Sequence, residues 1–393
     1  MSSMEKKKKR KRKTSTATTN TLSPSSPQST TAPLLPDDLL VSCFARVSRL
    51  YYPTFSLVSK RFRSLLASPE LYKARSLLGN TENYLYLCLG SHPRSLWYSL
   101  FLKPNQTLSN EKGKSSVSFL VTVPIPSSPS ARFQGLVAVG CNIYNIKETP
   151  YMEENKEELS SNVSVLDCLT HTWREAPRLP VKLMTLSASV LDAKIYVAGI
   201  GYKDGDSWGY LKNTFEVFDT RTHIWDPETI PCSETICSFN NSRSVSIDGK
   251  VHVKTNNVVA YNSKEVRWDL VGQEMGEYMT SDFCCVIENV LYSASHGVLR
   301  WYDSEVSRWK PLKGGLRKFS LGACVRLADY GGKLAVLWEQ EQELYGDKKI
   351  RFTEIALVRR KIEREIWGEV EWLSDVLRVP KSCSIVKVLG VTL

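Results

Sequence analysis

The feature that most constrains this 393-residue chain is a short pattern that occurs four times. An aspartate or asparagine follows two apolar or aromatic residues, and a tryptophan comes six positions later. Successive tryptophans of this pattern lie 52, 43 and 41 residues apart. Four matches at such a period indicate stacked structural units rather than one irregular domain. The pairs are Asp167 and Trp173, Asp219 and Trp225, Asn262 and Trp268, and Asp303 and Trp309.

Each repeat can be interpreted as one four-stranded antiparallel sheet, because its runs are rich in β-branched and aromatic residues. We expect the first hairpins to turn at two-residue pairs, three of which contain the Gly or Asn that favours positive φ. These pairs are Asp192-Ala193, Asp248-Gly249, Glu288-Asn289 and Gly331-Gly332.

Two less regular units bring the predicted number of sheets to six, with five as the alternative. One covers residues 84–101, where Trp97 would replace the repeated tryptophan, and the other begins at residue 334 and includes Trp367 and Trp372. Six sheets arranged radially leave no long open edge. We therefore predict a mainly β chain in which residues 81–393 form a β-propeller, closed by a terminal strand over 384–393.

The N-terminal tail, residues 1–33, holds most of the net charge of +11. Its Ser-, Thr- and Pro-rich part lacks the apolar residues that would offset ordering entropy, so we expect disorder. The basic run predicts nuclear import, with a solvated arm that meets polyanions by charge as the alternative. The expected location is therefore nucleus, cytoplasm or both. The run comprises Lys6, Lys7, Lys8, Lys9, Arg10, Lys11, Arg12 and Lys13.

Nothing in the sequence predicts secretion or a membrane segment. No apolar stretch follows the basic run, as a secretory signal requires. No apolar run approaches the ~18 residues of a membrane helix. The ten cysteines form no CxxC pair and fit a reducing compartment.

Residues 34–79 have the helical spacing of a small three-helix module. Pro36 and Asp37 suit the start of a first helix, Phe55 to Leu66 carry a second apolar stripe, and Ser68-Pro69 opens a third helix. Such a module is too small for a robust core of its own, yet it has more apolar residues than one face needs. This surplus predicts a partner. Two alternatives remain, namely packing on the repeat domain and a helix-turn-helix with its basic residues on phosphates.

The module resembles an F-box in the segments 35–39 (LPDDL), 57–63 (LVSKRFR) and 68–71 (SPEL). Together with the downstream repeats, the chain resembles the plant F-box/kelch-repeat family, and the six-residue spacing favours kelch over WD repeats. The resemblance implies docking onto a Skp-type adaptor and, through it, a cullin. The residues that it assigns to the adaptor-facing surface or its supporting core are Leu35, Pro36, Leu39, Val58 and Phe62.

Candidate chemistry is sparse in the repeat domain. Glu216, Asp219 and His223 offer iron ligands, but residues three apart on a strand face opposite sides. We find no nucleophile elbow, phosphate-binding glycine loop or HExxH motif. The chain is therefore predicted to be non-catalytic, with no cofactor and no metal.

Three long loops remain as a candidate client surface, at 145–162, 201–213 and 339–349. The first and third are acidic, and the middle one contains Trp208 and Tyr210, residue types that dominate interface energetics. Trp208 and Tyr210 are therefore our candidate client-binding residues, and tolerated insertion is the alternative.

The sequence thus predicts a substrate-recognition subunit of a cullin-type ubiquitin ligase that binds a client protein. Neither membrane nor nucleic-acid binding is expected. The alternatives are a kelch-type metal-dependent enzyme and a nuclear scaffold that binds nucleic acid through the basic run.

Overall fold

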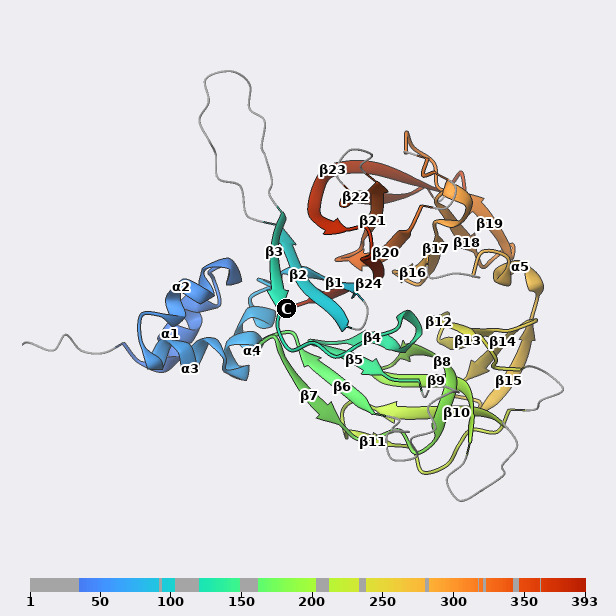
Figure 1. Cartoon of the computed structure of the whole chain (residues 1–393), viewed down its shortest axis with the longest axis horizontal. Coiled ribbons are helices and arrows are strands. Elements are labelled where there is room, and N and C mark those ends of the chain that lie inside the picture. The colour runs from blue at the N-terminus through green and yellow to red at the C-terminus, as the bar shows by residue number, and fades with distance from the viewer. Residues whose placement is uncertain are drawn as a thin grey trace, which may run out of the picture.

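The computed structural model describes residues 35–91, 94–102, 120–148, 162–202, 212–232, 238–279, 283–316, 318–320, 323–341, 346–360 and 362–393. A small helical module lies beside a ring of sheets (Figure 1). Within the described residues, no helix combines the length and apolar character needed to span a membrane.

The helical module contains four α-helices and one 3₁₀ turn. The second predicted helical stretch is divided at residues 57–59, because Ser59 adopts an extended conformation and its hydroxyl accepts a hydrogen bond from the Phe62 N–H. Gly79, at φ 65°, follows the last helix as expected. The elements are α1 (Asp37–Phe44), η1 (Arg49–Tyr51), α2 (Tyr52–Ser56), α3 (Lys60–Leu66) and α4 (Pro69–Leu77).

Six four-stranded antiparallel sheets form the blades of a propeller, so the prediction of six blades is confirmed. In chain order the first three contain β1 (Asn83–Ser91), β2 (Arg94–Leu102) and β3 (Leu120–Ile125); β4 (Leu136–Val139), β5 (Asn142–Ile146), β6 (Val163–Asp167) and β7 (Thr172–Ala176); and β8 (Lys182–Leu191), β9 (Lys194–Tyr202), β10 (Lys212–Asp219) and β11 (Ile224–Trp225). The next three contain β12 (Arg243–Ile247), β13 (Lys250–Lys254), β14 (Val258–Asn262) and β15 (Arg267–Val271); β16 (Cys284–Ile287), β17 (Val290–Ser293), β18 (Arg300–Asp303) and β19 (Arg308–Pro311); and β20 (Val325–Tyr330), β21 (Lys333–Glu341), β22 (Asp347–Arg360) and β23 (Glu365–Pro380).

The ring is closed by β24 (Ser384–Thr392), which pairs with β1 and completes the first blade, as the sequence predicts. This strand also contacts β20 and β4, the first strands of the two neighbouring blades. Short helical turns in the links between blades are η2 (Phe133–Gly135) and α5 (Gln273–Gly276), and η3 (Ser295–Gly297) lies between β17 and β18.

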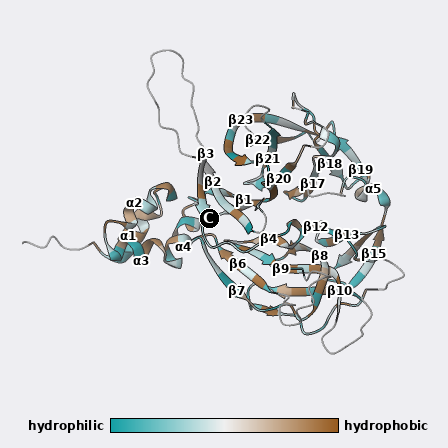
Figure 2. Ribbon diagram, viewed as in Figure 1, coloured by the Kyte–Doolittle hydropathy of each residue, from teal (hydrophilic) through white to brown (hydrophobic). Residues whose placement is uncertain are grey.

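The predicted two-residue turns are also present. Both residues of Asp192-Ala193, Asp248-Gly249, Glu288-Asn289 and Gly331-Gly332 have positive φ, and each pair joins the first two strands of a blade. Apolar clusters fill each interface between adjacent blades, and hydrophobic residues recur along the strands (Figure 2).

The repeated pattern is explained by the last hairpin of each blade. In blade 3, the Asp219 carboxylate accepts hydrogen bonds from the Arg221 and Thr222 N–H groups at 2.8 and 3.4 Å. His223 then takes a positive φ of 58°, and Trp225 follows Ile224 on the outer strand. The Trp225 indole N–H donates to the Pro177 carbonyl in the preceding link, 2.9 Å away. The aspartate therefore stabilises the turn, and the tryptophan forms a hydrogen bond between its own blade and the link that precedes this blade.

The two irregular blades depart from this pattern. Trp97 lies on β2 rather than on an outer strand, so it does not replace the repeated tryptophan; it is buried and its ring packs edge-on against Trp173, with centroids 5.3 Å apart. In blade 6, Ile366 pairs with Arg359 and comes two residues after the positive-φ Arg364. The position of the tryptophan is thus taken by Ile366, and not by Trp367 or Trp372.

Candidate functional site

An exposed apolar surface covers the start of α1 and the break between α2 and α3. Leu35 and Leu39 expose 52% and 49% of their surface, and Leu57 and Val58 expose 78% and 64%. Pro36, also exposed, lies between the first two. We call these five residues the docking surface.

Arg61 joins the two parts of the docking surface. Its guanidinium donates to the Leu35 carbonyl at 2.5 Å and forms an ion pair with the Asp37 carboxylate at 2.6 Å. The start of α3 is thereby held against the start of α1. Leu35, Pro36, Leu39 and Val58, four of the five residues that the F-box resemblance assigns to the adaptor, are thus exposed on these two parts.

Phe62, the fifth of these residues, contributes to the core beneath the surface. Its ring is half-buried and meets Phe44 edge-on, with centroids 4.9 Å apart. The buried core of the module is small, and it consists of Leu40, Phe44, Ala45, Tyr52, Leu66 and Leu71. A core of this size supports the surface but leaves its apolar residues in contact with solvent.

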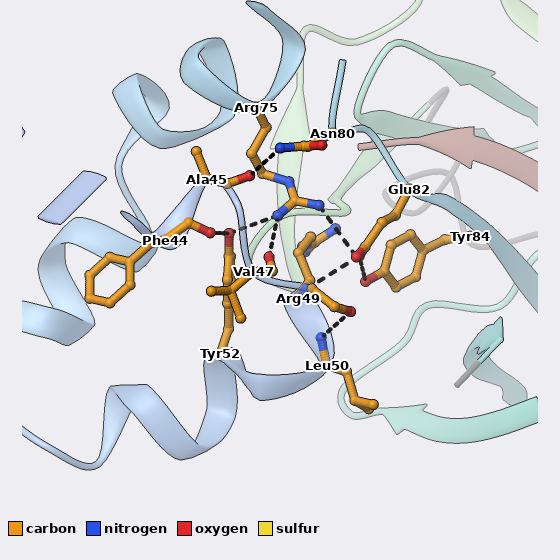
Figure 3. Close-up of polar contacts among 11 residues, drawn as sticks. Phe44, Ala45, Val47, Arg49, Leu50, Tyr52, Arg75, Asn80, Glu82 and Tyr84 are labelled. Atoms are coloured by element: carbon orange, nitrogen blue, oxygen red, sulfur yellow. Dashed lines mark hydrogen bonds and ion pairs between the residues drawn. The ribbon is translucent and has the colours of Figure 1, made fainter. Parts of the chain in front are cut away.

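A buried polar junction connects the module to the propeller (Figure 3). Arg75 of α4 is 1% exposed, and its guanidinium donates to the Val47 carbonyl at 2.6 Å and the Tyr52 hydroxyl at 3.0 Å. The same guanidinium lies 3.4 Å from a carboxylate oxygen of Glu82, the residue before β1. The other oxygen of Glu82 accepts from the Arg49 N–H and from the Tyr84 hydroxyl.

The side chain of Arg49 contacts the second blade. Its guanidinium donates to the Cys168 and Leu169 carbonyls in the turn between β6 and β7, each at 3.3 Å. The guanidinium also lies 4.8 Å from the centre of the Tyr84 ring and 5.4 Å from that of Tyr72. Burial raises the pKa of Tyr84, and the neighbouring positive charge of Arg49 opposes this effect.

His171 lies in the same turn of blade 2, where it has a positive φ of 55°. Its Nε2 atom is 3.1 Å from the Tyr86 hydroxyl. Burial, together with the nearby charge of Arg49, lowers the pKa of His171 to about 4, so the ring is neutral at pH 7. The junction therefore combines a neutral imidazole with two guanidinium groups and one carboxylate.

The sequence pattern gave no direct indication of Arg49, Arg75 or Glu82. The one available signal is that Arg75 lies four residues after the buried Leu71, on the face of α4 where an apolar residue is expected. A cation at such a position needs a partner. That partner comes from Glu82, beyond the end of the module.

The postulated iron ligands have structural partners instead. The Glu216 carboxylate is buried and accepts a hydrogen bond from the Thr229 hydroxyl at 2.9 Å, whereas Asp219 caps its turn. Across the ranges given above, His, Cys, Asp and Glu form no group of three or more that could hold a metal ion.

The predicted client residues Trp208 and Tyr210 lie outside the described residues, as does the basic run from Lys6 to Lys13. Among the described residues, the turn between β13 and β14 and the link with α5 border a pocket of about 410 Å³. Its lining mixes polar and apolar surface and includes Lys254, Asn256, Asn257, Gln273, Glu274 and Glu277.

Comparisons with known proteins agree with this arrangement. Residues 33–74 match the F-box domain family, and residues 97–377 match the family described as "FKB95, Kelch-repeats domain". F-box/kelch-repeat protein At5g51250 of Arabidopsis thaliana is 52% identical over 371 residues, which cover 91% of this chain and 99% of that protein. F-box/kelch-repeat protein At3g08810 of the same plant is 51% identical over 382 residues, covering 94% and 96%.

Proposed function

Because this chain belongs to the family of F-box/kelch-repeat proteins, we propose that it is a substrate-recognition subunit of a cullin-type ubiquitin ligase. The helical module would dock onto a Skp-type adaptor, and the propeller would bind a client protein. Ubiquitin transfer would be carried out by other subunits, and the contribution of this chain would be proximity. The chain itself would therefore need no catalytic residue, cofactor or metal.

The observation that carries this proposal is the docking surface. Leu57 and Val58, between α2 and α3, expose more than half of their surface. Several exposed apolar residues on so small a module favour a protein partner. Arg61 supports the interaction by fixing α1 and α3 relative to each other.

Capture of a purified Skp-type adaptor by the full chain tests the proposal. Leu35→Asp and Val58→Asp each place a charge within the docking surface, so we expect capture to weaken at least about 30-fold, as for a hot-spot residue. Leu77→Asp is the matched control, since Leu77 is 88% exposed at the far end of α4. Undiminished capture by both docking-surface variants would refute the assignment.

The client would bind the face of the ring that carries the long loops. The sequence of the middle loop supports this choice, because Trp208 and Tyr210 are of the residue types that contribute most to binding energy at interfaces. Replacing both with alanine should abolish the capture of clients from cell extract while adaptor capture persists. Unchanged recovery of every client would remove these two residues from the proposal.

We further propose that the basic run from Lys6 to Lys13 directs part of the protein to the nucleus. Clusters of Lys and Arg of this length are typical of import signals. Deleting residues 6–13 should shift a fluorescent fusion toward the cytoplasm. An unchanged distribution would favour the solvated basic arm.

A further inference from the structure

We infer that Glu82 is a positioning residue that fixes the orientation of the helical module on the propeller. Glu82 lies between the two parts of the chain, and its carboxylate contacts Arg75 and Arg49 of the module and Tyr84 of β1. One side chain thus connects α4, η1 and the first blade (Figure 3).

The charge on Arg75 makes this contact strong. The guanidinium is 1% exposed, and its other hydrogen-bond partners, the Val47 carbonyl and the Tyr52 hydroxyl, are neutral. Its Nε atom has no hydrogen-bond partner among the described residues. A buried cation is costly unless a carboxylate lies close by. Removing Glu82 would therefore favour any movement of α4 that returns Arg75 to water.

The backbone of Glu82 is itself held by the closing segment of the ring. Its N–H donates to the Leu393 carbonyl at 2.8 Å, and its carbonyl accepts from the Leu393 N–H at 2.9 Å. Leu393 directly follows β24, the strand that completes the first blade. The position of the Glu82 carboxylate is thus set by the same pairing that closes the propeller.

A second set of contacts prevents rotation about Glu82. Arg49 donates to two carbonyls in the turn between β6 and β7, and Asn80 donates to the Ala45 carbonyl at 3.3 Å. The module is therefore attached to both the first and the second blade. Contacts with two blades, together with the bond from Asn80 in the link, restrict the orientation more than one flexible tether would.

This orientation matters for the proposed function, because a fixed module holds the client at one distance and angle from the adaptor. The orientation of the module and the capture of the adaptor can nevertheless be measured separately. If Glu82 positions the module, its removal changes the orientation while leaving the docking surface, none of whose residues contacts its carboxylate, able to capture the adaptor.

Double electron–electron resonance on the full chain tests this directly. Spin labels are attached through noncanonical residues at Lys73, exposed on α4, and at Leu270, 70% exposed on β15, so the native cysteines stay unlabelled. We expect one narrow distance distribution for the wild type and loss of that narrow distribution in Glu82→Ala. Glu82→Gln, which keeps an acceptor oxygen but not the charge, should lie between them.

Glu369→Ala is the matched control, since Glu369 is exposed on β23 of the same propeller. Hydrogen exchange gives a second readout. Amides in 45–52 and 75–82 should exchange about tenfold faster in Glu82→Ala, whereas amides of blades 3 to 5 should not change. A distribution that is already broad in the wild type, or that stays equally narrow in both Glu82 variants, would overturn the inference.

Discussion

In the helical module, Leu57 and Val58 expose 78% and 64% of their surface, whereas in the propeller Phe215 and Leu337 are completely buried. The module also buries the guanidinium of Arg75, at its contact with the ring. The propeller buries its apolar side chains in its own six blade interfaces, and a closing strand completes the ring. The module contacts the ring on one side, and the proposed adaptor would cover its exposed apolar residues.

The largest loss of stability should come from a substitution in the propeller core. Phe215 is fully buried between blades 3 and 4, where its ring lies 4.8 Å from that of Trp268. Phe215→Ala should lower the free energy of unfolding by about 4 kcal/mol, because it leaves a cavity. Denaturant unfolding measures this change, with Val370→Ala, at a half-exposed position on β23, as the control. Equal losses for the two variants would contradict the view that the blade interfaces carry the stability.

A fall in pH should destabilise the junction through His171. The folded pKa of His171 is about 4 and its ordinary value is 6.5, so between these values the unfolded chain binds a proton that the folded chain does not. Its contribution to stability is complete above pH 6.5 and decreases as the pH falls toward 4, by about 3 kcal/mol.

His252, which burial also gives a pKa of about 4, adds a similar slope, so the measurement must be a difference. His171→Asn tolerates the positive φ at this position and removes the titrating group. We expect the pH dependence of unfolding between 6.5 and 4 to be shallower in this variant. A slope identical to that of the wild type would show that His171 does not titrate with folding.

A smaller effect should come from the repeated aspartate. Asp219→Ala removes the acceptor for the Arg221 and Thr222 N–H groups and should lower the melting temperature by much less than Phe215→Ala does. Thermal unfolding can detect this loss against Glu228→Ala, an exposed neighbour in the same blade. An unchanged melting temperature for Asp219→Ala would mean that the repeat is maintained for a reason other than turn stability.

The smallest effect on stability should come from the docking surface. Leu57→Ser should change the free energy of unfolding by less than about 0.5 kcal/mol, because Leu57 makes little contact within the chain. Adaptor capture by the same variant should nevertheless decrease. A loss of stability comparable to that of Phe215→Ala would remove the contrast between the module and the propeller.

The parts of the fold that follow from local chemistry could be predicted from the sequence. Asp248-Gly249 and the pair of Asp219 and Trp225 encode turns within a few residues, and the period of the tryptophans gave the six blades. The exposed Leu35 and Val58 follow from an apolar surplus together with the F-box resemblance. Each of these signals is contained in a short segment.

The features that depend on distant segments could not be predicted in this way. Arg49 donates to carbonyls more than a hundred residues away, and nothing near Arg49 in the sequence indicates that turn. Trp97 was assigned to the wrong strand, and Ile366 was not singled out at all, because a tryptophan alone does not show which strand of a degenerate blade carries it. In both cases the position depends on pairing across the sheet.

Affinity purification under proteasome inhibition, with and without an intact docking surface, tests the central claim most directly. The wild-type chain should recover a Skp-type adaptor, a cullin and one or more clients. Leu35→Asp combined with Val58→Asp should lose the adaptor and the cullin but keep the clients, which should also become more abundant in cells. If this double variant recovers as much adaptor and cullin as the wild type, the chain is not the ubiquitin-ligase receptor proposed above.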